Sequence, residues 1–217
     1  MNPEQRRAVE TTEGPMLILA GAGSGKTKTL THRIAHLLSS HKATPYNILA
    51  VTFTNKASAE MRSRIAVLLG QPTDNRALLP FMGTFHSVCV RILRQDGESI
   101  GIPRNFVIWD ESDRLAAIKQ ASLRAGIDEK SFPPKLLASL ISGAKNEMVT
   151  PEEFLGFANS PAAKAAAKVF PLYERSLREA HALDFDDLIA RTVEMLSRQE
   201  DVQAKWQKQF KYVMVDE

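Results

Sequence analysis

Residues 16–27, Met16-Leu17-Ile18-Leu19-Ala20-Gly21-Ala22-Gly23-Ser24-Gly25-Lys26-Thr27, decide the fold class. The apolar run over residues 16–20 predicts a buried parallel strand, and the glycine-rich turn after it leads into a helix that begins at Gly25 or Lys26. Glycines let successive backbone N–H groups point into one concavity, and a helix N-terminus adds partial positive charge there. The stretch therefore predicts a phosphate-binding loop and the start of an α/β fold with a parallel sheet.

The polar side chains of this loop predict a bound nucleotide with Mg²⁺. Lys26 supplies a full positive charge to the β- and γ-phosphates, and the Thr27 hydroxyl ligates the metal ion. The one departure from the consensus G-x-x-x-x-G-K-[ST] is Ala20, which stands at the position of its first glycine. A glycine-rich turn that binds nothing is the plain alternative. The predicted phosphate-binding residues are Ala20, Gly21, Ala22, Gly23, Ser24, Gly25, Lys26 and Thr27.

Composition places the chain among ordinary globular proteins. Hydrophobic residues make up 44% of the 217 residues and charged residues 24%, and the net charge of +3 is compatible with nucleic acid without requiring it. Cys89 is the only cysteine, so an internal disulfide is impossible and a reducing, cytoplasmic compartment is favoured. The sequence shows no signal-peptide pattern and no apolar run of membrane-spanning length, so we expect no membrane partner.

Strand and helix patterns alternate at both ends of the chain. They predict further strands at residues 47–53, 81–85 and 212–217. Polar residues follow two of these strands, Thr54-Asn55-Lys56 after the first and His86-Ser87 after the second. In an open parallel sheet, ligands bind at the carboxyl ends of the strands, so these residues are candidates for a site.

Strand patterns nearly vanish between Gly101 and Ala182. Helix-start signals such as Thr150-Pro151-Glu152-Glu153 occur there instead. A helical segment of this length within an alternating chain indicates an insertion domain. The predicted organisation is a P-loop domain formed by residues 1–100 and 183–217, interrupted by a helical insertion over residues 101–182.

Three further residues have two interpretations each, and a fourth has only a plain one. Asp216 and Glu217 end the last apolar strand, and in P-loop NTPases such a pair holds the Mg²⁺ shell and polarises the attacking water; solvated acids are the plain interpretation. Gln5 is either the third residue of a capping box begun by Asn2 or an amide that pairs with an adenine edge. Arg33 follows on the helix after the loop, where a solvated surface charge is the plain interpretation.

Six motifs in a fixed order carry a resemblance to a known family. They are Asn2-Pro3-Glu4-Gln5, residues 20–27, Val51-Thr52-Phe53-Thr54-Asn55-Lys56-Ala57, Gly83-Thr84-Phe85-His86-Ser87, Leu183-Asp184-Phe185-Asp186-Asp187-Leu188 and Val215-Asp216-Glu217. Over essentially its whole length, the chain resembles the N-terminal part of superfamily 1 DNA helicases of the UvrD/Rep/PcrA type. The resemblance implies a RecA-like P-loop domain interrupted by a helical subdomain, with ATP and Mg²⁺ as cofactors. It also implies ATP-driven 3′-to-5′ movement on single-stranded DNA and action at single/double-strand junctions.

The resemblance also assigns residues. It implies that Gln5 reads adenine and that Lys26, Asp216 and Glu217 serve catalysis, with Thr27 and Asp216 at the metal ion. Aromatic rings stack on bases regardless of sequence, while hydroxyl, amide and ammonium groups serve the phosphate backbone. Core packing is the plain alternative for the two phenylalanines. The residues implied to contact or sense DNA are Phe53, Thr54, Asn55, Lys56, Thr84, Phe85 and His86.

Family sequences continue past the Asp-Glu pair into a second RecA-like domain, whose arginines complete the ATP pocket. We therefore expect this chain to be a fragment that binds nucleotide without efficient hydrolysis or unwinding, because such arginines are worth roughly 10³–10⁵ in rate. Uncovered apolar surface should favour self-association of the fragment. A P-loop ATPase or kinase that does not act on nucleic acid is the alternative.

Overall fold

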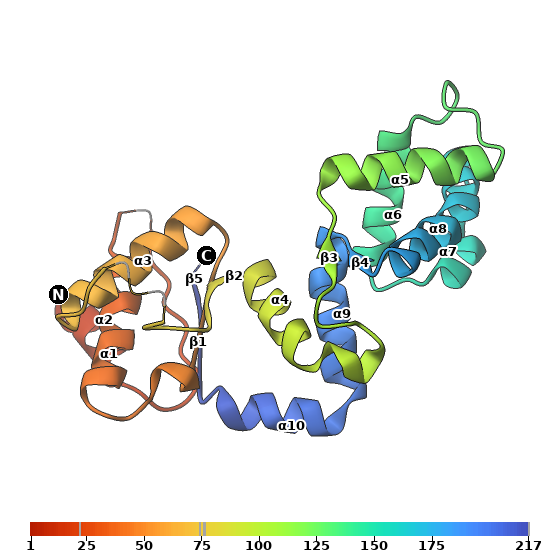
Figure 1. Cartoon of the computed structure of the whole chain (residues 1–217). Coiled ribbons are helices and arrows are strands. Elements are labelled where there is room, and N and C mark those ends of the chain that lie inside the picture. The colour runs from red at the N-terminus through yellow and green to blue at the C-terminus, as the bar shows by residue number, and fades with distance from the viewer. Residues whose placement is uncertain (22, 74, 76, 217) are drawn as a thin grey trace. The chain divides into compact units, whose positions relative to one another are not determined.

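In the computed structural model of the chain, every residue is described except residues 22, 74, 76 and 217 (Figure 1). The chain forms two compact units, Met1–Val88 with Asp201–Glu217, and Cys89–Glu200. The first unit holds a parallel sheet, and the second consists mainly of helices. The boundaries between the units fall within two helices, α4 (Phe85–Asp96) and α10 (Glu200–Gln209). The other elements of the first unit are α1 (Pro3–Glu10), α2 (Lys26–Ser39), η1 (Pro45–Asn47), β1 (Ile48–Thr52), α3 (Asn55–Leu68), β2 (Met82–Thr84) and β5 (Tyr212–Asp216).

The sheet of the first unit has the predicted parallel arrangement. β1 lies between β2 and β5 and pairs in parallel with both (Figure 1). Thr52 at the end of β1 is in register with Thr84 of β2 and with Asp216 of β5. Because parallel strands end at the same edge, the residues that follow these positions gather along one edge of the sheet.

The predicted strand over residues 16–20 is wrong. These residues form no strand, and Leu17 and Leu19 are 82% and 86% exposed rather than buried. A strand takes its hydrogen bonds from a neighbouring strand, and in the described part of the chain β5 pairs only with β1. In the described part of the chain, the apolar run over residues 16–20 therefore has no neighbouring strand with which to form hydrogen bonds.

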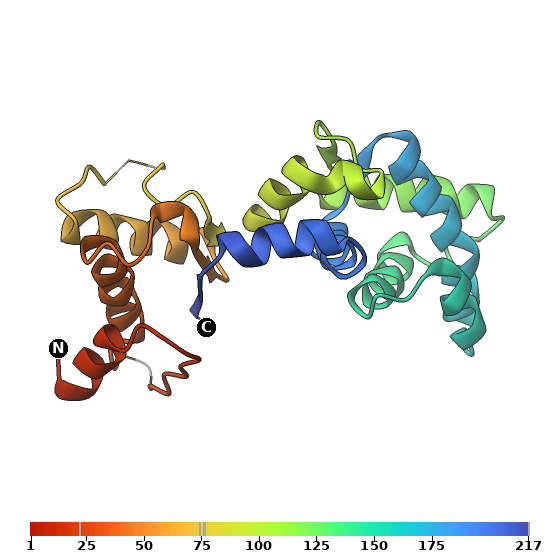
Figure 2. The same cartoon turned by 90° about the horizontal axis from the view of Figure 1, so that it is seen from below.

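Helices α2 and α3 pack together and bury the core of the first unit (Figure 2). Ile34 and Leu37 of α2 are fully buried with Ile48 of β1 and with Met61 and Ile65 of α3. Burying a side chain of this size contributes roughly 1.5–3 kcal/mol. This packing holds α2 against the sheet, and it thereby fixes the loop that precedes α2.

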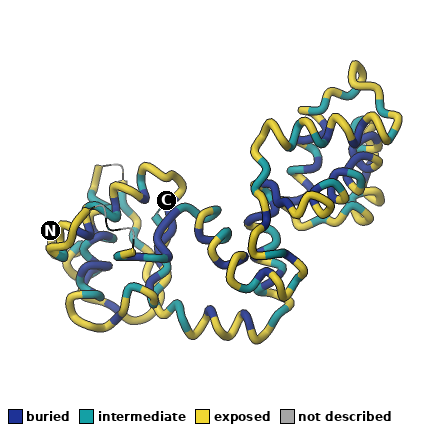
Figure 3. Tube along the Cα trace, viewed as in Figure 1, coloured by how far each residue is buried: buried dark blue, intermediate teal, exposed yellow. Residues whose placement is uncertain are grey.

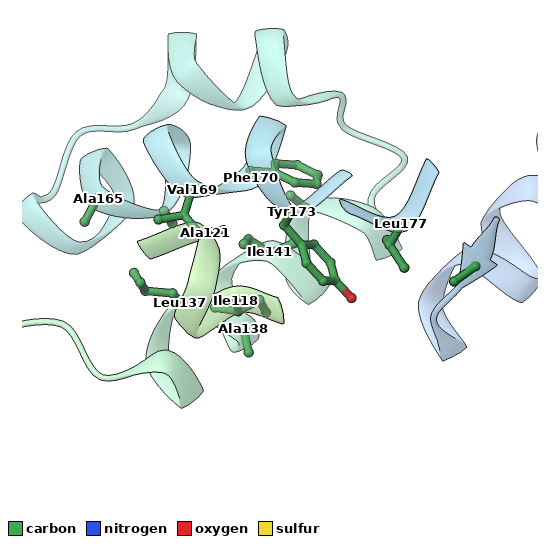
Figure 4. Close-up of a cluster of buried hydrophobic side chains, with 13 residues drawn as sticks. Ile118, Ala121, Leu137, Ala138, Ile141, Ala165, Val169, Phe170, Tyr173 and Leu177 are labelled. Carbon is green, nitrogen blue, oxygen red and sulfur yellow. The ribbon is translucent and has the colours of Figure 1, made fainter. Parts of the chain in front are cut away.

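The second unit is built around helices α5, α6 and α8, whose apolar side chains meet in one core (Figure 4). The inner face of α8 is largely buried (Figure 3). No helix among the described residues has both the length and the apolar character that crossing a membrane needs. The other elements of this unit are η2 (Gly97–Ile100), β3 (Val107–Ile108), α5 (Glu111–Arg124), α6 (Pro134–Asn146), α7 (Pro151–Phe157), α8 (Pro161–Glu179), β4 (Ala182–Leu183) and α9 (Phe185–Arg198), with β3 and β4 paired in parallel.

A buried ion cluster joins three helices of the second unit. Lys145 Nζ on α6 lies 2.8 Å from Glu174 Oε1 on α8 and 2.8 Å from Asp184 Oδ2, the N-cap residue of α9. The same nitrogen lies 3.0 Å from Asp187 Oδ1, and the Tyr173 hydroxyl donates to Asp184 Oδ2 at 2.7 Å. Burial opposes the positive charge of Lys145, but the three carboxylates outweigh it and raise its pKa. Burial and the two neighbouring carboxylates raise the pKa of Asp187 to about 7, although Lys145 opposes them.

Candidate functional site

The glycine-rich loop makes a tight turn before α2. Gly23 and Gly25 have φ angles of 75° and 90°, in the left-handed region that favours glycine. Ser24 N donates to Gly21 O at 3.2 Å, and Ser24 Oγ donates to the same oxygen at 2.6 Å. Helix α2 begins at Lys26, and its N-cap residue Gly25 offers no side-chain acceptor. The first N–H groups of α2 therefore lack a side-chain cap, which suits an anion at the helix N-terminus.

Thr27 and Asp216 meet although 189 residues separate them in the sequence. Thr27 Oγ1 at the start of α2 donates to Asp216 Oδ2 at the end of β5, at 3.1 Å. Hydroxyl and carboxylate oxygens are ligands that Mg²⁺ accepts, and this metal ion is usually held by one or two protein groups together with substrate phosphates. Among the described residues, no group of three or more His, Cys, Asp or Glu could hold a metal ion by itself. The donor set therefore fits a nucleotide-bound Mg²⁺ better than a dedicated metal cage.

A groove in the first unit leads to these residues. It has a volume of about 770 Å³ and is lined by residues 12–20, by Lys26, Leu30 and Arg33, and by residues 211–216. Lys26 and Asp216 thus border the same hollow, one from α2 and the other from β5. In the part of the chain that the structure describes, the Lys26 ammonium has no hydrogen bond or ion pair, so it is open to an anion.

Gln5 forms the predicted capping box and also contacts the loop. Its Oε1 accepts from Asn2 N at 3.0 Å, and Gln5 N donates to Asn2 Oδ1 at 2.8 Å. Its Nε2 donates to Ser24 O at 2.9 Å. A Cβ atom at Gly25 would lie 3.0 Å from that nitrogen, so a side chain there would push against the end of the Gln5 side chain. The Gln5 amide therefore lies beside the predicted phosphate site, and adenine recognition remains a prediction.

The interpretation of Arg33 as a solvated surface charge is wrong. Its side chain is buried, and its guanidinium donates to Ala8 O at 2.6 Å, to Thr12 O at 3.3 Å and to Thr11 O. Burial lowers the pKa of Arg33. These acceptors are backbone oxygens more than 20 residues away, so no side-chain pattern in the sequence could have indicated them.

The predicted DNA-contacting residues follow β1 at the carboxyl edge of the sheet. Phe53 is 73% exposed, which argues against a place in the core, and its ring lies edge-on to that of Phe85 with centroids 6.0 Å apart. Thr54 Oγ1 accepts from Ala57 N at 3.1 Å and caps α3. Asn55 and Lys56 are exposed on the first turn of that helix.

The residues after β2 form a second tight turn at the same edge. Ser87 Oγ donates to Thr84 O at 2.9 Å, and Ser87 N donates to Thr84 Oγ1 at 3.3 Å. A Cβ atom at Gly83 would lie 2.2 Å from Ser87 Oγ, so a side chain at this position would displace the Ser87 hydroxyl from its bond to Thr84 O. Phe85 and His86 are partly buried at the start of α4.

Two predicted site residues, Ala22 and Glu217, lie outside the described residues. The other predicted nucleotide-site residues, from Gln5 to Thr27 and Asp216, lie in the first unit. Sequence reasoning missed Arg33, and it also missed Lys42, whose Nζ donates to Thr12 Oγ1 at 2.8 Å.

Comparison with known proteins gives one consistent result. The whole chain, residues 1–217, matches the UvrD/REP helicase N-terminal domain. It is 49% identical over all 217 residues to the ATP-dependent DNA helicase PcrA of Staphylococcus epidermidis and 48% identical to that of Staphylococcus aureus. In both cases it spans 29% of the relative's length. The chain therefore belongs to the UvrD/Rep helicase family and corresponds to its N-terminal domain.

Proposed function

We propose that residues 1–217 are the ATP-binding part of a longer ATP-dependent DNA helicase that moves 3′-to-5′ along single-stranded DNA. The observation that carries this proposal is the contact between Thr27 and Asp216, which joins the phosphate-binding loop to the end of β5. The similarity to PcrA helicases supports DNA as the substrate and does not favour a P-loop enzyme that acts elsewhere. Cytoplasm is the compartment that we propose, because DNA and a free Cys89 both fit it.

Different residues of the first unit serve different parts of the bound nucleotide. When bound, Mg²⁺-ATP supplies the phosphoryl group that is transferred to water. Lys26 binds the β- and γ-phosphates, Thr27 and Asp216 hold the metal ion, and Gln5 reads adenine. We assign to Glu217 the role of accepting the proton of the attacking water.

We propose a RecA-like domain formed by residues 1–100 and 183–217, with residues 101–182 as a helical insertion. A second RecA-like domain in the longer protein would supply arginines to the ATP pocket, and such an arginine is worth roughly 10³–10⁵ in rate. The isolated chain should therefore bind nucleotide with little turnover. The exposed side chains of Leu17, Leu19, Val213 and Val215 are the surface through which it should self-associate.

The DNA track of this unit is proposed along the carboxyl edge of the sheet. Phe53 offers an exposed ring for stacking on a base, while the exposed Asn55 and Lys56 offer polar groups to the phosphate backbone. Thr84, Phe85 and His86 lie at the adjacent strand end and would couple DNA to the nucleotide site. Single-stranded DNA that runs along this edge would fit the expected action at single/double-strand junctions.

Phe53→Ala tests the DNA assignment. In the longer protein, single-stranded DNA is expected to stimulate ATP hydrolysis, and the variant should need roughly 5- to 150-fold more DNA for half-maximal stimulation, because a base stack is worth about 1–3 kcal/mol. The ATP affinity should stay unchanged. Tyr46→Ala is the matched control, since Tyr46 is also an exposed aromatic residue, 61% exposed, and lies just before β1, at the other end of that strand. ATP turnover that does not respond to DNA would contradict the proposed function, and equal losses of DNA and ATP affinity would assign Phe53 to packing.

A further inference from the structure

The Arg33 side chain clamps the end of α1 from within α2. Helix α1 ends at Glu10, and the last carbonyl groups of a helix have no partner inside it. The Arg33 guanidinium donates to Ala8 O inside α1 and to Thr11 O and Thr12 O beyond its end. It also lies 3.7 Å from the Sδ atom of Met16, in the segment that enters the phosphate-binding loop.

These hydrogen bonds take the place of the carboxylate that usually forms an ion pair with a buried cation. In the described part of the chain Arg33 forms no ion pair within 4.0 Å, and its side chain is nevertheless buried. Burial disfavours the charge of Arg33, and Tyr212 and Glu13 oppose this only from beyond ion-pair distance. Hydrogen bonds to carbonyl oxygens offset the remaining cost while the acceptors stay in place. The end of α1 and the next residues are therefore held in one position relative to α2. Lys42 adds a second bond to the same segment, at Thr12.

The clamp connects the two groups that face the nucleotide. Gln5 lies on α1, close to the carbonyl groups that Arg33 holds, and its Nε2 reaches Ser24 O in the loop. Lys26 and Thr27 lie at the start of α2, about two helical turns before Arg33. The distance between the Gln5 amide and the Lys26 ammonium therefore depends on the packing of α1 on α2. Arg33 makes three hydrogen bonds across this packing, beside those of Gln5 to Ser24 O and of Lys42 to Thr12.

We propose that Arg33 is a positioning residue for adenine recognition, which it serves by fixing α1 so that the Gln5 amide stands at a set distance from the phosphate site. This inference rests on the proposed function, in which Gln5 reads adenine. We assign Arg33 no contact with the base or the phosphates, because its guanidinium donates to the backbone oxygens of residues 8, 11 and 12. Its loss should weaken the contribution of the base to binding and leave the contribution of the phosphates intact.

The test compares two probes on the isolated chain, ATP and inorganic tripolyphosphate, both with Mg²⁺. Arg33→Lys keeps the charge but loses the planar fork that reaches several carbonyl groups at once. We expect a roughly tenfold higher Kd for ATP, which corresponds to about 1.4 kcal/mol, and less than a twofold change for tripolyphosphate. Arg62→Lys is the matched control, because Arg62 also donates to backbone oxygens, those of Leu79 and Met82, away from α1. The control should change neither Kd.

Gln5→Ala separates this inference from the proposed function. It should raise the Kd for ATP, and adding Arg33→Lys to it should raise that Kd no further, because the second residue acts through the first. If Gln5→Ala leaves both affinities unchanged, the adenine role in the proposed function fails. If Gln5→Ala weakens ATP alone while Arg33→Lys changes nothing, or weakens both probes equally, the positioning role is overturned. Should Arg33→Lys not fold, Arg33→Gln is measured instead, since it keeps two N–H donors without a buried charge.

Discussion

Lys26→Ala should abolish ATP hydrolysis by the longer protein, with turnover reduced at least about 10²–10³-fold. The Lys26 ammonium stands at the N-terminus of α2 in the groove that Asp216 also borders. The loop before Lys26 offers no other cation that could replace it, because residues 20–25 are all glycine, alanine or serine. Steady-state hydrolysis with saturating single-stranded DNA measures the loss.

Lys208→Ala is the control for this substitution. Lys208 is an exposed lysine in the last turn of α10, outside the predicted site. Its removal changes the net charge by the same amount and should leave turnover within about twofold, since exposed charges contribute little. Retention of a tenth or more of the normal rate by Lys26→Ala would contradict the phosphate role of Lys26.

Lys145→Met should destabilise the second unit by about 3–5 kcal/mol, because it removes the buried cation that all three carboxylates share, while Arg191 continues to pair with Glu174 and Asp187 only. Chemical denaturation at pH 7 measures this loss. Lys119→Met is the control: Lys119 pairs with Glu129 at the surface, with side chains 51% and 48% exposed, and its loss should cost less than about 1 kcal/mol. Similar values for the two variants would contradict the structural role of the cluster.

The pH dependence of this stability follows from Asp187. Its pKa is raised in the folded chain from the ordinary value of 3.8 to about 7. Between these values the folded state binds more protons at Asp187 than the unfolded state does, so the free energy of unfolding falls as the pH rises. Lys145 lowers the pKa of both Asp184 and Asp187, so the pKa of each of these two carboxyl groups should rise when Lys145 is removed. The cost of Lys145→Met should therefore be smaller at pH 5 than at pH 8.

Local chemistry made most of the first unit predictable. The glycine-rich turn, the start of α2 at Lys26 and the apolar runs of β1 and β5 each follow from a pattern within a few residues. The capping box begun by Asn2 was predictable for the same reason. Parallel pairing places the ends of β1, β2 and β5 at one edge of the sheet, together with the predicted site residues at those ends.

The errors concern contacts between distant parts of the chain. Residues 16–20 have the composition of a strand, but a strand also needs a partner, which their sequence cannot specify. Arg33 looks like any polar residue on a helix, and its acceptors are backbone oxygens that have no sequence signature. Lys145 and Glu174 meet Asp184 from two other helices, so only the folded unit reveals the cluster.

The contact between Thr27 and Asp216 is the centre of the proposed function. The direct test is the Mg²⁺ dependence of ATP affinity for the isolated chain, measured for Thr27→Val, Asp216→Asn and the double variant. We predict that each single substitution removes most of the gain in affinity that Mg²⁺ provides, and that the double variant loses little more, because both oxygens serve one metal ion. An Asp216→Asn chain whose ATP affinity responds to Mg²⁺ as the unaltered chain does would contradict the account.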